Sequence, residues 1–144
     1  VNLIQILISS GMTVTLRPHW LAFQTNSKAL ANIQEIHCSS QGFTFETENM
    51  SVESLKRSDL MICDLSGIAL EYVFANFKPI IYIDIPPRVR NTSYEKVGVP
   101  ALELRLRPKT GLIVSVEDLL NIPNAIEKLL SSLAREVYSR DSRL

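Results

Sequence analysis

The feature that most constrains this chain is the stretch 58–84, in which two short apolar runs flank a segment with helical periodicity. The runs 60–63 and 80–83 have the length and composition of strands buried in a parallel sheet. Between them, apolar residues recur at helical intervals, at Ile68, Leu70, Val73, Phe74 and Phe77. Pro79 disfavours any continuation of that helix. Strand, helix and strand in this order predict a right-handed βαβ unit.

The turn at Ser66 and Gly67 is the most informative part of this unit. A helix that starts there points its first backbone N–H groups, and the positive end of its dipole, out of the carboxyl edge of the sheet. Gly67 has no side chain, so an anion can approach the backbone. Glu71, one turn further on, can accept hydrogen bonds from two ribose hydroxyls. Together they predict a nucleotide diphosphate site; the alternative is that Ser66 only caps the helix and Glu71 is only solvated.

A second polar group follows the β-branched run 13–16, which predicts a strand. Pro18 ends that strand, so Arg17 and His19 lie at its carboxyl end, where open α/β sheets bind ligands. Arg17 could pair with a phosphate, and His19 could bind phosphate or act as an acid or base. The simpler interpretation of His19 is a loop histidine with a backbone partner.

The segment 85–98 combines prolines, arginines and polar residues, and it predicts a loop that leaves the carboxyl edge of a strand. It could be a mobile cover that brings Arg88 or Arg90 to a diphosphate, or simply a solvated basic loop.

Other elements are predicted on both sides of this region. The alternation of leucine with charged residues over 102–106 predicts a half-exposed edge strand, followed by a turn at 109–111. His37 is interpreted as a favourable charge at a helix C-terminus. The apolar run within 1–10 allows a helix or a strand, and we favour a helix. The remaining expectations are helices near 27–37, 51–55 and 125–140, strands at 43–46 and 112–114, and a cap at Ser115.

Composition narrows the class of protein. The 144 residues suffice for one domain, and a net charge of +0 gives no reason to expect a nucleic-acid partner. The two cysteines form no disulfide framework and no metal-binding spacing, so we expect no metal. No apolar run reaches the ~20 residues of a membrane span, and no signal peptide is recognised. The chain begins with Val1 rather than Met, and we interpret it as a piece of a longer protein.

Three separated blocks share their order and spacing with one family: Arg17-Pro18-His19, the run 58–72, and Lys78-Pro79-Ile80. They resemble the CDP-glycerol glycerophosphotransferases, the family of teichoic acid polymerases and primases and their relatives in capsule and surface-glycan synthesis. The pattern of that family reads roughly Arg-Pro-His-Pro, then Ser-Asp-hydrophobic-Ile-Thr-Asp-Tyr-Ser-Ser with a Phe-Glu or Phe-Asp pair, then Lys-Pro-Ile.

The resemblance implies a two-lobed glycosyltransferase fold of the type called GT-B, in which the carboxyl-terminal lobe binds the activated nucleotide. It implies that His19 belongs to the phosphate site and to catalysis. It would also place Ser66 and the Gly67 amide on the diphosphate and Glu71 on the ribose. Arg17 would support the His19 turn or the anion.

Three residues depart from the family pattern. Trp20 stands where proline is usual, Leu65 replaces tyrosine, and Gly67 replaces the second serine. The last change removes a hydroxyl but keeps a backbone donor. Ser-Gly followed by Glu also resembles the nucleotide sites of other GT-B enzymes and of UDP-sugar epimerases, so CDP-glycerol, CDP-ribitol and a UDP- or CMP-linked sugar all remain open as donors.

We therefore expect one α/β domain over 1–144, a Rossmann-like, doubly wound and mostly parallel sheet with helices on both faces. Its expected function is the donor-binding lobe of a glycerophosphotransferase or related glycosyltransferase, with no cofactor other than the nucleotide-linked donor. The acceptor, a glycan or polyol-phosphate polymer, would bind through a missing amino-terminal lobe, in the cytoplasm or at the inner face of the membrane. The alternatives are a non-catalytic α/β binding domain and a UDP-sugar-dependent transferase or epimerase lobe.

Overall fold

The computed structural model describes residues 2–47, 52–86, 93, 96 and 98–141, with side chains described to Leu133 in the last helix. The chain forms two compact units, which we call the amino-terminal unit (Val1–Ser54) and the carboxy-terminal unit (Leu55–Leu144). Each is described by itself. Both contain short parallel strands flanked by helices, so the protein is of the α/β class.

The amino-terminal unit has a two-stranded parallel sheet. Its elements are α1 (Leu3–Ser9), β1 (Val14–Leu16), α2 (Trp20–Thr25), α3 (Ser27–His37), β2 (Phe43–Phe45) and the start of α4 (Glu53–Arg57). Strand β1 pairs with β2 in parallel, with Leu16 opposite Phe45. The helices and strands predicted here are confirmed, and α2 is an additional helix in a segment for which no element was predicted.

His37 differs from its predicted role. It is in the last turn of α3, as expected, but it is buried, with only 1% of its surface exposed. Asn2 caps α1 with its side-chain oxygen, which accepts from the Gln5 N–H. The amide nitrogen of Asn2 is then left to contact His37 Nε2 at 3.2 Å. His37 therefore also packs inside the unit, with its ring centre 5.2 Å from that of Phe43 and the two rings tilted by 45°.

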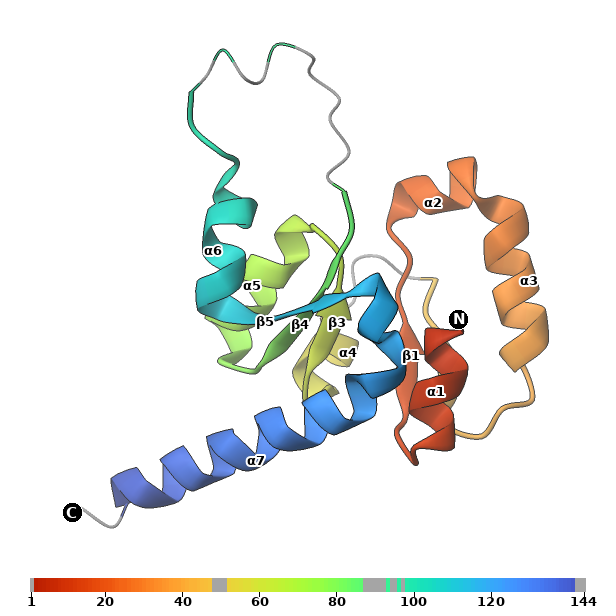
Figure 1. The fold of residues 1–144 in the computed structure, drawn as a ribbon. Helices are drawn as coiled ribbons and strands as arrows, with labels where there is room; N and C mark the ends of the chain where they lie inside the picture. Colours follow the sequence, from red (N-terminus) through yellow and green to blue (C-terminus); the bar gives the residue numbers. More distant parts are fainter. Residues whose placement is uncertain (1, 48–51, 87–92, 94–95, 97, 142–144) are drawn as a thin grey trace. The chain divides into compact units, whose positions relative to one another are not determined.

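The carboxy-terminal unit holds a three-stranded parallel sheet in the order β3-β4-β5 (Figure 1). Its further elements are β3 (Met61–Cys63), α5 (Gly67–Asn76), β4 (Ile80–Asp84), α6 (Leu102–Thr110), β5 (Gly111–Ser115), a 3-10 helix η2 (Val116–Asn121) and α7 (Ile122–Asp141). Cys63 is opposite Tyr82, and Asp84 is opposite Ser115. The βαβ unit predicted from 58–84 is confirmed as β3-α5-β4, and Ser115 is at the predicted cap position.

Helices α5 and α6 cover one face of this sheet. Both crossovers advance in the same direction along the strand order, and right-handed connections then place both helices on the same side. Alternate residues of β4 point to that face, and Ile80 and Tyr82 pack there with Ala69 and Tyr72 of α5. Asp84 continues this alternation, so its side chain leaves the same face at the carboxyl end of the strand.

The edge strand predicted over 102–106 is wrong, because these residues form helix α6. The face of α6 that is turned inward has the helical spacing Glu103, Leu106, Arg107 and Thr110. Two of these four residues, Glu103 and Arg107, are charged, so the inward face has no apolar periodicity in the sequence. The alternation of leucine with charged residues was therefore interpreted as a strand. The predicted turn is also displaced, because Lys109 and Thr110 end the helix and Gly111 starts β5.

Lys78, from the third block of the resemblance, has a structural role. Its ammonium group donates to the backbone carbonyl oxygens of Lys56 and Ser58, at 2.6 and 2.7 Å. The Tyr72 hydroxyl donates to the same Ser58 carbonyl, at 3.1 Å. Lys78 thus binds carbonyl oxygens at the C-terminal end of α4, where a positive charge also interacts favourably with the negative end of the helix dipole.

Within the described residues, no helix combines the length and the apolar character that crossing a bilayer requires.

Candidate functional site

The start of α5 is the position at which the sequence predicts an anion site. Ser66 is the N-cap in an extended conformation, and within the described residues its hydroxyl makes no cap hydrogen bond. The Ser66 carbonyl accepts from the Ala69 N–H at 3.2 Å, which closes the first turn. A Cβ added at Gly67 would meet no atom within 4 Å, so the backbone there faces open space. Gly67 is exposed, and the N–H groups of Gly67 and Ile68 have no partner within the helix, whereas that of Ala69 is bonded to Ser66.

Glu71 is on the same side of α5 as Gly67, four residues further along. It is exposed, whereas its helix neighbours Ala69 and Tyr72 are buried against the sheet. Among residues 52–86 and 98–133 no hydrogen bond or ion pair occupies its carboxylate. Glu71 can therefore accept hydrogen bonds from a ligand that binds at the helix start.

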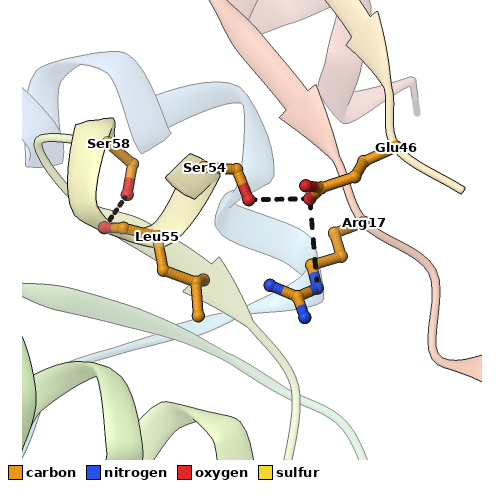
Figure 2. A network of polar contacts seen from close by, with 5 residues as sticks. All are labelled: Arg17, Glu46, Ser54, Leu55 and Ser58. Atoms are coloured by element: carbon orange, nitrogen blue, oxygen red, sulfur yellow. Dashed lines mark hydrogen bonds and ion pairs between the residues drawn. The ribbon is translucent and has the colours of Figure 1, made fainter. Parts of the chain in front are cut away.

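Arg17 has a carboxylate partner that the sequence interpretation did not anticipate. Its Nε is 3.9 Å from Glu46 Oε2, and the two side chains are only 16% and 14% exposed. The same Glu46 oxygen accepts from the Ser54 hydroxyl at 2.7 Å, as Figure 2 shows. Glu46 follows β2 as Arg17 follows β1, directly after the Leu16–Phe45 pair, so the parallel register could have revealed it. Its carboxylate offsets the charge that Arg17 was predicted to offer a phosphate.

His19 caps α2 with its ring, since Nδ1 accepts from the Leu21 N–H at 3.2 Å. In the neutral imidazole one nitrogen accepts and the other carries the proton, so this bond assigns the proton to Nε2. The exposed ring then presents an N–H donor, with Trp20 beside it at 5.6 Å between centroids. His19 is suited to donating to a phosphate oxygen rather than to removing a proton. The backbone partner expected in the simpler interpretation is present.

The predicted site residues fall into separate parts of the structure. Arg17 and His19 are in the amino-terminal unit, and Ser66, Gly67 and Glu71 are in the carboxy-terminal unit. The structure brings the last three together at one helix start, and it gives no placement of the first two against them. The predicted Arg88 and Arg90 lie outside the described residues.

A pair missed in the sequence lies at the carboxyl end of β4. Arg107 of α6 is 5% exposed, and its Nη2 is 3.2 Å from Asp84 Oδ1 and 3.4 Å from the Ile83 carbonyl oxygen. Its guanidinium carbon lies 5.3 Å from the centre of the Tyr82 ring. The one sequence signal was an aspartate at the end of a buried strand, because Arg107 lies between the strand predicted over 102–106 and the turn predicted at 109–111 and was given no role.

Cys63, at the end of β3, is protected from ionisation. Burial, and secondarily the nearby Asp64, raise the pKa of its thiol to about 12, although the Arg107 charge opposes the shift. A thiol in this state is a poor nucleophile and a poor metal ligand. No group of three or more histidine, cysteine, aspartate or glutamate side chains in the described part of the chain is arranged to hold a metal ion.

The comparisons with known proteins add no relative. No family model matches the chain, and neither a curated protein nor a solved structure does.

Proposed function

We propose that this chain is the donor-binding lobe of a CDP-glycerol glycerophosphotransferase or a related glycosyltransferase of cell-surface polymer synthesis, with a GT-B-type, doubly wound fold in the parent protein. The observation that carries the proposal is the open start of α5, with Gly67 facing free space and Glu71 exposed on the same side of the helix. Helix starts of this kind bind phosphate groups, and a neighbouring carboxylate suits a ribose diol.

The proposed chemistry is electrostatic. Backbone N–H groups at Gly67 and Ile68, with the Ser66 hydroxyl, would bind the diphosphate and stabilise the charge that grows on the leaving nucleotide. An Nε2–H donor at His19 would fit a phosphate oxygen in the same reaction, and Arg17, Arg88 and Arg90 stay predicted contributors. The acceptor hydroxyl and its base would come from the other lobe of the parent enzyme, in the cytoplasm or at the inner membrane surface.

Calorimetric titration with CDP, CMP and UDP tests this proposal. We expect CDP to bind more tightly than CMP, because the second phosphate adds charge at the helix start. Glu71→Gln should weaken CDP binding by about tenfold, which corresponds to one lost hydrogen bond to a charged acceptor. Glu127→Gln, an exposed glutamate of α7, is the matched control and should bind as the parent chain does.

Two outcomes would contradict the proposal: no heat with any of the three nucleotides, or the same affinity in the Glu71 and Glu127 variants. Tighter binding of UDP than of CDP would favour the UDP-sugar transferase or epimerase alternative, because only the base differs between these two ligands.

A non-catalytic binding domain is the second candidate, and two contacts favour it. His19 Nδ1 is engaged in capping α2, and Arg17 is paired with Glu46, so both predicted phosphate ligands have local structural roles. Transfer or hydrolysis of a CDP-linked donor by the full-length parent protein separates the candidates. In the catalytic case activity is present and falls in a His19→Asn variant, whose side-chain oxygen preserves the cap but not the Nε2–H donor.

A further inference from the structure

The Asp84–Arg107 pair is unusual for a small α/β unit. Arg107 is almost fully buried, while the Asp84 side chain is 60% exposed. Burying an arginine costs solvation energy, and a well-packed apolar residue often serves stability as well or better. Within the described residues Arg107 Nε has no hydrogen-bond partner, so the pair is not an optimised structural bridge. The arrangement instead holds an exposed carboxylate in one orientation.

The location of Asp84 connects it to the start of α5. Cys63 of β3 is paired with Tyr82 of β4. Asp84 is two residues beyond Tyr82, just as Leu65, in the turn between β3 and α5, is two residues beyond Cys63. Neighbouring strands are about 4.8 Å apart, so the carboxylate emerges one strand away from that turn. It also leaves the face of the sheet that α5 covers. Asp84 therefore lies at the same carboxyl edge of the sheet as the turn that leads into α5, and this is the edge where parallel sheets bind ligands.

The charges of Asp84 and Arg107 determine which ligand groups can bind beside them. A lone carboxylate would repel a diphosphate at the helix start, but the Arg107 guanidinium offsets the charge of Asp84. One carboxylate oxygen is held by Arg107, and in the described part of the chain Oδ2 makes no hydrogen bond. An offset carboxylate with a free oxygen is a good acceptor for hydroxyl groups and a weak ligand for a divalent cation.

We propose that Asp84, held by Arg107, accepts a hydroxyl of the polyol or sugar carried on the diphosphate, and so selects the transferred group. Asp84 is the ligand-contacting residue, and Arg107 is its positioning residue. This inference rests on the proposed function, because the nucleotide must first bind at the α5 start, but it assigns a different part of the donor. Glu71 contacts the ribose and Asp84 contacts the group beyond the second phosphate.

The experiment compares the affinity of the 144-residue chain for CDP-glycerol with that for CDP, by calorimetry without divalent cations. The unmutated 144-residue chain should bind CDP-glycerol more tightly than it binds CDP. Asp84→Asn keeps the shape of the side chain. If the asparagine oxygen accepts the Arg107 hydrogen bond, its NH2 group, a donor, takes the place of Oδ2. This variant should lower CDP-glycerol affinity by about tenfold and leave CDP affinity unchanged. Glu127→Gln, remote and exposed, should change neither.

Arg107→Lys tests positioning, because it keeps the charge but cannot contact Asp84 and the Ile83 carbonyl together as the guanidinium does. We expect an intermediate loss confined to CDP-glycerol, with the CDP affinity showing that the unit is folded.

Other outcomes overturn the inference in distinguishable ways. If the ratio of CDP-glycerol affinity to CDP affinity is the same in Asp84→Asn as in the unmutated chain, Asp84 does not contact the polyol. CDP binding in that case still supports the proposed function. An equal loss for CDP and CDP-glycerol assigns Asp84 to the nucleotide or to the fold instead. An effect seen only after adding Mg²⁺ makes Asp84 a metal ligand. Failure of the parent chain to bind CDP removes both the proposed function and this inference.

Discussion

At the residue scale, the two cysteines should differ sharply in reactivity. Burial raises the pKa of the Cys63 thiol to about 12, so almost none of it is thiolate near neutral pH, whereas Cys38 is exposed. We expect iodoacetamide to alkylate Cys38 in the native chain and to reach Cys63 only after denaturation. Mass spectrometry of the peptides checks this, and native labelling of both cysteines at one rate would contradict it.

The same pKa shift predicts a loss of stability in alkali. Between the ordinary pKa of 9.0 and the raised pKa of about 12, the folded state keeps the Cys63 proton, whereas the unfolded state loses it. The contribution of Cys63 to the free energy of unfolding is therefore complete below pH 9.0 and is lost as the pH rises from 9.0 to about 12. Burial also raises the pKa of Tyr72, which acts in the same direction. Urea midpoints measured across this window should fall, and less steeply in Cys63→Ala than in the parent chain.

At the element scale, the end of α5 carries a residue in an unfavourable conformation. Phe77 is in the left-handed region, with φ 53°, and is 89% exposed, so its ring gains little from packing. Glycine adopts this conformation without the strain of a Cβ, so Phe77→Gly should raise the free energy of unfolding by about 1 kcal/mol. Phe74→Gly, an exposed position inside the same helix, should lower it by about 1 kcal/mol. Urea denaturation measures both, and equal signs would contradict the assignment.

Elements were predictable wherever periodicity was carried by apolar side chains. Strands β3 and β4 and helix α5 follow from such a pattern, and so does the position of the α5 start at Gly67. Helix α6 was missed because the residue that points inward is Arg107, whose burial depends on Asp84 and Tyr82, partners distant in the sequence. The Glu46 partner of Arg17 was missed for a related reason, because strand register is a tertiary property.

At the scale of the whole molecule, the two units should differ in stability. In the amino-terminal unit, Leu7 and Pro18 are the buried apolar residues among those that the structure describes. The carboxy-terminal unit buries a larger set: Ala69, Tyr72, Ile80, Ile81, Tyr82, Val114, Ile122 and Ile126. Small units with little buried apolar surface are marginal. We expect the fluorescence of Trp20, the single tryptophan, to change at lower urea than the far-ultraviolet circular dichroism.

Coincident transitions with the two probes would contradict that expectation and indicate one cooperative domain over 1–144, as predicted from length. Sequence length alone could not distinguish these cases, because it bounds how much core a chain can form but not how its contacts cluster.

In the proposed function, backbone N–H groups at the start of α5 bind the phosphates of a nucleotide. The most direct measurement follows backbone amide resonances of the ¹⁵N-labelled chain during titration with CDP. We expect saturable shifts that are largest at Gly67 and Ile68, extend to Glu71 and are absent when cytidine replaces CDP. Saturable binding with those amides unmoved, or no binding at all, would contradict it.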